Sequence, residues 1–315
     1  MAHYTVLNNT DLQTILTHYT VGKVVSYTVL SGGSENTNYL VRTEVGAFVL
    51  TICEQKSEEE AHKLATLLVY LNRHNFETSG LVKTTSGAFT VIWNEKPVML
   101  KAYIEGDIIK ELPKNLLVYL GKELGKLHQI PPPDYLPQAL NYGIEHFDKV
   151  QKYAKNSSFY LWLKDVQKYI ESHINSDLPK SLIHSDIFYN NIIVDKEGKT
   201  ATVMDFEEAC YYFRVFDIGM TIIGTCSKDQ VLNLDDVTSL LEGYQQEVSL
   251  LSIEIDALQA FTTYGAAATA YWRHQNYNYV NVDESMRDHY VAMKKQADQV
   301  MSIPSEEFID CLIPN

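Results

Sequence analysis

A change in hydrophobic pattern near residue 105 is the feature that most constrains the fold of this chain. Before it, β-branched and aromatic residues dominate three segments separated by glycines: 24–30, 37–43 and 47–53. Beyond it, apolar residues recur at helical spacing, most clearly along the leucines of 116–127. This order predicts an α+β protein with a small antiparallel-sheet lobe followed by a larger, mainly helical lobe.

Local signals place further elements of the first lobe. We expect a short helix near residues 10–19. Ser57 followed by Glu60 forms a capping-box pattern, so a long helix is predicted to follow the third strand. Two more strands are expected, at 89–93 and 98–104. They end at Glu105-Gly106-Asp107, where polar and flexible residues interrupt the pattern.

The chain therefore divides into two predicted domains. Residues 1–104 form the expected sheet lobe, and residues 105–315 form the expected helical lobe. Within the second lobe, a short β interlude is predicted over residues 181–205, and a late helix over residues 264–279. The 315 residues are ample for two lobes with a sizeable core.

Composition excludes several classes of function. The chain has 26 Lys and Arg against 40 Asp and Glu, and its net charge of −14 repels nucleic acids and anionic membranes. The four cysteines form no C-x-x-C pair, which disfavours a disulfide framework and a thiolate zinc site. No segment reaches the roughly 18 apolar residues of a membrane span, and no basic-to-apolar leader opens the chain. We therefore expect a cytoplasmic protein with no nucleic-acid or membrane partner.

A polar cluster in the β interlude carries the strongest chemical signal. His184, Asp186 and Asn191 follow an H-x-D-x-x-x-x-N pattern, and Asp205-Phe206 follows the next strand. Phosphoryl transfer needs an acceptor that orients the attacking hydroxyl and oxygen ligands for Mg²⁺, and kinases supply them at this spacing. Alone, each residue is more often a satisfied core histidine or a turn acid, but the combination is specific.

The cluster predicts a division of roles. We expect Asp186 and His184 to be catalytic. A hard cation prefers carboxylate and amide oxygens, so Asn191 and Asp205 are the expected ligands of Mg²⁺.

A glycine-rich loop lies between the first two predicted strands, at Ser31-Gly32-Gly33-Ser34-Glu35-Asn36. Such a hairpin could lay backbone N–H groups over phosphates, although taken alone it is an ordinary turn. Neither a G-x-G-x-x-G nor a G-x-x-x-x-G-K-[ST] pattern is present, so dinucleotide-binding and Walker-type sites are unsupported.

In this order, the segments 32–39, 184–191 and 205–206 resemble the aminoglycoside phosphotransferase and choline kinase superfamily, which has a bilobal protein-kinase-like fold. The N-terminal lobe is most similar to homoserine kinases of the kinase-like type. The resemblance implies that Asp186 is the catalytic base, that Asn191 and Asp205 hold Mg²⁺, and that Asp217 braces the catalytic loop.

The resemblance also implies an ATP site. Loop residues would cover the phosphates: Ser31, Gly32, Gly33, Ser34 and Asn36. The strand that contains Lys101 and Tyr103 would meet the adenine. One departure stands out, because Thr51 occupies the place on the third strand where such kinases carry a phosphate-binding lysine. The sequence assigns that role to no other lysine.

The acceptor is the least determined feature. Homoserine carries an ammonium and a carboxylate, which Glu207 or Glu208 and Arg273 could meet. Choline would prefer an aromatic cage, for which Tyr271 and Trp272 are candidates. Both aromatic residues could equally pack in the core while Arg273 extends to solvent. Homoserine is the first expectation, and choline, ethanolamine or an aminoglycoside are alternatives.

The expected partners are therefore MgATP and a small-molecule acceptor. A third class of function is a nucleotide-binding pseudokinase, and its support is the missing lysine at Thr51. The catalytic pattern at Asp186, Asn191 and Asp205 argues against it.

Overall fold

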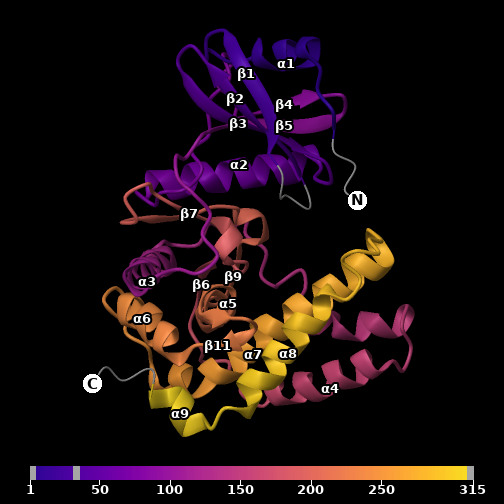
Figure 1. Ribbon diagram of the computed structural model, residues 1–315, viewed down its shortest axis with the longest axis vertical. Coiled ribbons are helices and arrows are strands. Elements are labelled where there is room, and N and C mark those ends of the chain that lie inside the picture. Colours follow the sequence, from indigo (N-terminus) through magenta and orange to yellow (C-terminus); the bar gives the residue numbers. More distant parts are fainter. Residues whose placement is uncertain (1–4, 31–35, 311–315) are drawn as a thin grey trace. The chain divides into compact units, whose positions relative to one another are not determined.

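The computed structural model describes residues 5–30 and 36–310. The chain forms two compact units that divide between Glu105 and Gly106 (Figure 1).

The first unit is built on a five-stranded sheet in the order β1-β2-β3-β5-β4, with every neighbouring pair antiparallel. Its strands are β1 Val24–Leu30, β2 Asn36–Thr43, β3 Gly46–Cys53, β4 Thr90–Trp93 and β5 Lys96–Ala102. The meander predicted for the first three strands is confirmed. The fifth strand begins and ends two residues earlier than the predicted segment 98–104.

Two helices complete this unit. Helix α1, Asn9–Leu16, ends before the predicted limit at Tyr19, because Tyr19 instead forms a β-bridge with Thr84. Helix α2, Glu58–Arg73, begins with the predicted capping box and contacts β4 and β5. One face of the sheet packs with α1 in an apolar cluster that includes Leu12, Ile15, Tyr39, Leu50, Ile52, Val98 and Leu100.

The second unit is mainly helical, as predicted. Its helices are α3 Lys114–Gln129, α4 Ser158–Glu171, α5 Arg214–Thr225, α6 Leu234–Gln245, α7 Ser252–Gln275, α8 His289–Ser302 and α9 Ser305–Asp310, with a 3₁₀ segment η1 at Ile144–Lys152. Helix α3 packs on α6, and α7 packs on both α5 and α8 (Figure 1). The leucine stripe predicted for α3 is buried. Together the two units confirm the α+β class.

Helix α7 differs from its predicted bounds. It begins twelve residues before the expected residue 264, and a π-helical turn, η4 Asn276–Val280, follows its end. Most of α7 is buried on several sides, so its sequence lacks the apolar stripe that marks an amphipathic helix. Within the described residues, the helices are too short or too polar to span a bilayer.

Short strands in the second unit hold the polar segments of the β interlude. They are β6 Lys180–Ile183, β7 Ile192–Val194, β8 Ala201–Val203 and β9 Cys210–Phe213, and β10 Ser227–Lys228 pairs with β11 Val231–Leu232 elsewhere. Strands β7 and β8 form a hairpin, and β6 pairs with β9. The sequence did not indicate β9. Because β9 pairs with β6, the segment 204–209 that precedes β9 lies beside the loop 184–191 that follows β6.

Candidate active site

The loop between β6 and β7 holds Asp186 and Asn191 against each other. The Asn191 side-chain amide donates to the backbone oxygen of Asp186 at 2.8 Å and to its carboxylate Oδ2 at 3.1 Å. These bonds use the amide nitrogen and leave the amide oxygen of Asn191 as a ligand atom. The predicted five-residue spacing therefore produces a closed turn with one carboxylate and one amide oxygen.

Asp217, on α5, holds the start of this loop through hydrogen bonds to its backbone. Its carboxylate accepts hydrogen bonds from the backbone N–H groups of His184 at 2.8 Å and Ser185 at 2.6 Å. Ser185 has a φ of 69°, a left-handed conformation that is costly for a residue with a side chain. The charge-assisted hydrogen bonds offset that cost. Asp217 therefore stabilises the backbone conformation of the two residues that precede Asp186.

Close approach of α5 also positions the loop. A Cβ atom on Gly224 would lie 2.1 Å from the backbone oxygen of Ile187. Only a glycine therefore allows the helix and the loop to pack this closely.

His184 lies beside Asp186, but both of its ring nitrogens are already used. Nδ1 accepts from the backbone N–H of Asp186 at 3.1 Å, and Nε2 donates to the backbone oxygen of Met204 at 2.7 Å. Burial lowers the pKa of His184, which keeps the ring neutral in this tautomer. Both nitrogens of His184 are therefore engaged with backbone, which is the geometry of a residue that positions the loop, and the catalytic role expected from the sequence stays a prediction.

A second histidine, which sequence reasoning missed, supports the same acid. His128, at the end of α3, donates from Nε2 to the Asp217 carboxylate at 3.1 Å. Its Nδ1 lies 2.9 Å from the hydroxyl of Tyr244 on α6, which can donate to it. The side chains of His128 and Asp217 are fully buried. The only sequence signal was a histidine at the end of an otherwise apolar stripe.

Tyr142 and Glu208 connect the loop to the segment after β8. The buried hydroxyl of Tyr142 donates to the backbone oxygen of Ser185 at 2.5 Å. The Ser185 hydroxyl donates to the backbone oxygen of Glu208 at 2.8 Å. Burial and the charges of Asp186 and Glu208 raise the pKa of Tyr142, so it remains a neutral donor. Tyr142 is a second residue of this network that no sequence pattern indicates.

Asp205 follows β8 and is exposed. It has a φ of 67°, and the backbone N–H of its neighbour Met204 donates to the backbone oxygen of Asn191 at 2.8 Å. The β7–β8 hairpin therefore brings the end of one strand beside the start of the other. No group of three or more His, Cys, Asp or Glu side chains that could hold a metal occurs among the described residues.

The donor set at the hairpin nevertheless fits Mg²⁺. This ion keeps several waters and binds one or two protein oxygens together with substrate phosphates. An amide oxygen from Asn191 and a carboxylate from Asp205 are such a set.

Several carboxylates lie close enough to the loop to influence one another. Burial, followed by the charges of Asp205 and Glu208, raises the pKa of Asp186 to about 8. The hydrogen bond from Asn191 and the charge of Arg273 act in the opposite direction. This cluster of carboxylates favours a bound cation, because each added positive charge relieves their mutual repulsion.

The structure separates the three neighbouring residues proposed for the acceptor at the end of α7. Tyr271 is 1% exposed and packs against Phe147, so it is a core residue rather than the wall of an open cage. Trp272 is partly buried and packs edge-on to Tyr277. The guanidinium of Arg273 lies over the ring of Phe188, with its Cζ atom 5.8 Å from the ring centroid. Its positive charge acts to lower the pKa of Asp186.

Glu207 and Glu208 are both partly buried and follow Asp205 in a short 3₁₀ turn, η3 Phe206–Glu208. The Glu208 carboxylate accepts from the side chain of Asn141 at 3.0 Å. Its charge raises the pKa of Asp186, whereas that of Glu207 is not among the principal causes. Glu208 is therefore the better placed of the two near the loop.

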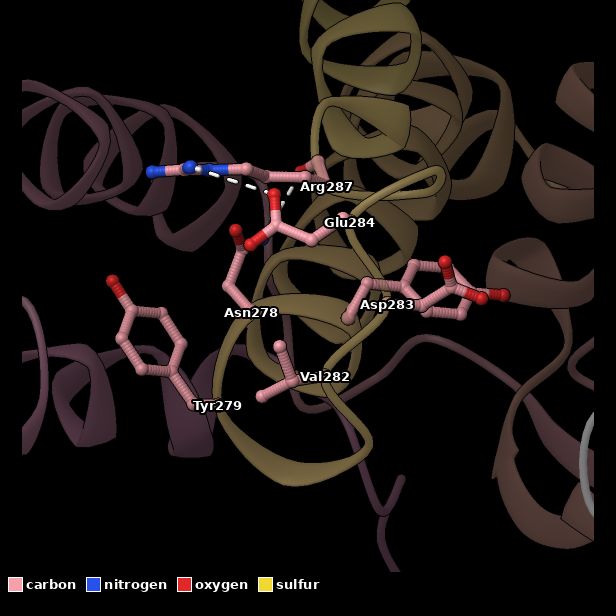
Figure 2. A pocket seen from close by; sticks show the side chains of 7 residues that line it. Asn278, Tyr279, Val282, Asp283, Glu284 and Arg287 are labelled. Atoms are coloured by element: carbon pink, nitrogen blue, oxygen red, sulfur yellow. Dashed lines mark hydrogen bonds and ion pairs between the residues drawn. The ribbon is translucent and has the colours of Figure 1, made fainter. Parts of the chain in front are cut away.

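A shallow pocket of about 220 Å³ lies in the segment after α7. Figure 2 shows its lining side chains and the ion pair of Glu284 with Arg287, whose closest atoms are 3.9 Å apart. Tyr277, the partner of Trp272, also lines it. The pocket therefore adjoins the proposed aromatic residues but contains neither Tyr271 nor Arg273.

In the first unit, part of the predicted nucleotide site lies outside the described residues: Ser31, Gly32, Gly33 and Ser34. Asn36 begins β2 and is buried. Lys101 lies on β5, and the backbone N–H of Tyr103 donates to the oxygen of Ala47 at 3.1 Å. The side-chain hydroxyl of Thr51 donates to Asn38 at 2.8 Å.

Comparisons with known proteins identify relatives of this chain. Residues 26–253 match the phosphotransferase enzyme family. The chain is 28% identical over 274 residues to a homoserine kinase of Chelativorans sp., and the match covers 82% of each protein.

Solved kinase structures share the fold. An amicoumacin kinase in complex with AMP-PNP, Ca²⁺ and amicoumacin gives a TM-score of 0.75 at 15% identity, covering 95% of this chain and 97% of that one. A microcompartment-associated aminopropanol kinase gives 0.73 at 18%, covering 96% and 99%. The fold is therefore protein-kinase-like, as predicted.

Proposed function

Because the chain belongs to the phosphotransferase enzyme family, we propose that it is an ATP-dependent kinase that phosphorylates the hydroxyl of a small amino alcohol. The observation that carries this proposal is the closed turn of Asp186 and Asn191, with Asp205 at the end of the adjoining hairpin. Kinases use this set of residue types for phosphoryl transfer. The N-terminal residues 31–34 and 36, together with Lys101 and Tyr103, are the proposed nucleotide-binding groups.

In this proposal Asp186 orients the acceptor hydroxyl and accepts its proton. Asn191 and Asp205 would hold Mg²⁺, which would supply positive charge against the nucleotide phosphates. Asp217 and His184 keep the loop in the geometry that the reaction needs, through the backbone contacts described above. Transfer then depends mainly on positioning and electrostatics.

We propose homoserine as the first acceptor. Glu208 and Arg273 have opposite charges, and both charges influence the pKa of Asp186. A substrate with an ammonium group for Glu208 and a carboxylate for Arg273 would complement them. The similarity to a homoserine kinase agrees with this choice. The burial of Tyr271 disfavours the aromatic cage that choline would need. An ATP-dependent reaction on a metabolite also agrees with the cytoplasmic location expected from the sequence.

Release of ADP from MgATP tests the proposal. The acceptors are homoserine, aminopropanol, choline, ethanolamine and an aminoglycoside, each assayed with the parent protein and with Asp186→Asn. We expect homoserine to give the highest kcat/KM and Asp186→Asn to give almost no turnover. Turnover with choline or an aminoglycoside but not homoserine would reject the acceptor and leave the kinase reaction. Nucleotide binding without turnover on any acceptor would instead favour the pseudokinase.

A further inference from the structure

Cross-strand pairing divides the side chains of the first sheet between two faces. Leu50 and Ile52 of β3 lie on the face that packs with α1. Since side chains alternate along a strand, Thr51 lies on the opposite face. Its cross-strand partners there are Asn38 on β2 and Met99 on β5. This second surface, the Thr51 face, is where a kinase lysine of the third strand would project.

Lys101 lies on the Thr51 face. It pairs with Val49, which is two residues before Thr51 and therefore on the same side of β3. It is also two residues after Met99, the direct partner of Thr51. Such diagonal neighbours have Cβ atoms roughly 7–8 Å apart, within reach of a long side chain. Lysine has a flexible four-carbon side chain. The ammonium of Lys101 can therefore reach the place where a lysine at position 51 would put its positive charge.

The other cations of the described strands are less suitable. Lys96 lies two residues before the buried Val98 of the apolar cluster, so it is on the same face as Val98 and opposite to Thr51. It also forms an ion pair with Glu54 at 2.5 Å. Arg42 is on the Thr51 face, but it is exposed and four residues from Asn38. That separation is about 13 Å along the strand.

The environment of Lys101 also differs from that of Lys96. Lys101 is partly buried, and no hydrogen bond or ion pair with another described residue occupies its ammonium. Thr51, in contrast, already has a hydrogen-bond partner in Asn38. A cation that no described residue neutralises, on a face whose other side chains are apolar or uncharged, is suited to an anionic ligand.

We propose that Lys101 of β5 supplies the phosphate-binding charge that other kinases carry on β3, so that the lysine has moved to the neighbouring strand. This inference rests on the proposed kinase function. It assigns Lys101 to the phosphates of the nucleotide, whereas its place near the expected hinge strand had suggested the adenine.

Binding of ATP, ADP and adenosine to Lys101→Met tests the assignment, because the three ligands share the base and differ in phosphates. Dissociation constants are measured by calorimetry with excess Mg²⁺. A charge-assisted contact is worth roughly tenfold to hundredfold in affinity, so ATP should bind that much more weakly. Adenosine should bind within about twofold of the parent, as expected if the removed contact involves only phosphate. Lys101→Arg keeps the charge and should retain most of the ATP affinity.

Lys23→Met is the matched control, because it removes one positive charge from an exposed position of the same unit. It should leave all three affinities unchanged. An unchanged ATP affinity in Lys101→Met, or an equal loss for ATP and adenosine, would overturn the proposal. If Lys101→Met melts below the assay temperature, Lys101→Gln takes its place in the same comparison. A parent protein that binds no nucleotide would reject the kinase function itself.

Discussion

The loop 184–191 and the end of α7 each bury a histidine, but the two histidines have different kinds of contact. In the loop, both ring nitrogens of His184 are hydrogen-bonded to backbone. At the end of α7, His274 is stacked on Phe159 with ring centroids 4.1 Å apart and lies edge-on to Tyr290 at 4.8 Å. The buried Nδ1 of His274 has no hydrogen-bond partner among the described residues.

The difference shows how the two regions are stabilised. Directional hydrogen bonds with Asp217, Tyr142 and Asn191 hold the loop that carries Asp186. Apolar packing holds the end of α7, and such packing tolerates changes of shape more readily than a network of short hydrogen bonds.

Removing the base should have the largest effect and tests the loop directly. We expect Asp186→Asn to lower kcat by about a hundredfold or more, because the acceptor hydroxyl loses its proton acceptor. MgATP affinity should change little, since the metal ligands remain. Single-turnover assays and calorimetry measure the two quantities. Near-parental turnover would remove Asp186 from the proposed mechanism.

Weakening the hydrogen bonds from the loop backbone to Asp217 should have the next largest effect. Asp217→Asn removes the charge that holds the N–H groups of His184 and Ser185, so kcat should fall by about tenfold to hundredfold. ATP affinity should stay nearly constant, which separates positioning from binding. Asp236→Asn, at another buried acid of the same unit, is the control for general destabilisation. Equal losses of kcat in the two variants would contradict a specific role for Asp217.

On the acceptor side, Glu208→Gln should lower kcat/KM for homoserine by about tenfold, because an ammonium loses its charged partner. Glu207→Gln is the matched control and should have a smaller effect, since Glu208 is the glutamate that acts on Asp186. Initial rates over a range of homoserine concentrations measure both. A larger loss in Glu207→Gln would reverse the assignment, and parental values in both would place the ammonium elsewhere.

The smallest expected effect concerns stability at the end of α7. Burial among Phe159 and the tyrosines at 153, 279 and 290 lowers the pKa of His274 to about 4. Below pH 6.5 the unfolded chain therefore takes up a proton that the folded protein does not, and stability falls as the pH falls toward 4. Between pH 7 and 5.5 this residue should cost about 1 kcal/mol of unfolding free energy.

His274→Phe tests this difference between the regions, because it keeps a ring of similar size and removes the titration. Urea unfolding at pH 7 and pH 5.5 should show a stability loss that is about 1 kcal/mol smaller in the variant than in the parent. The same loss in both proteins would show that His274 is not the group that titrates.

Sequence spacing was most informative where the chemistry is local. The five residues from Asp186 to Asn191 form one turn, and the capping box at Ser57 and Glu60 forms one helix start, so short patterns predicted both. His128 and Asp217 are 89 residues apart, and Tyr142 reaches Ser185 across 43. No local pattern marks such pairs, because only the packing of segments that are distant in the sequence brings them together.

The sequence by itself determined the order of sheet and helical regions, the family, and the residue types of the proposed phosphoryl-transfer loop, because these depend on periodicity and short spacing. Only the tertiary structure decided that Tyr271 is core, that both ring nitrogens of His184 are hydrogen-bonded to backbone, and that Lys101 shares a face with Thr51. Burial, hydrogen-bond saturation and strand register arise from contacts between distant segments. They therefore appear only once those segments are packed together.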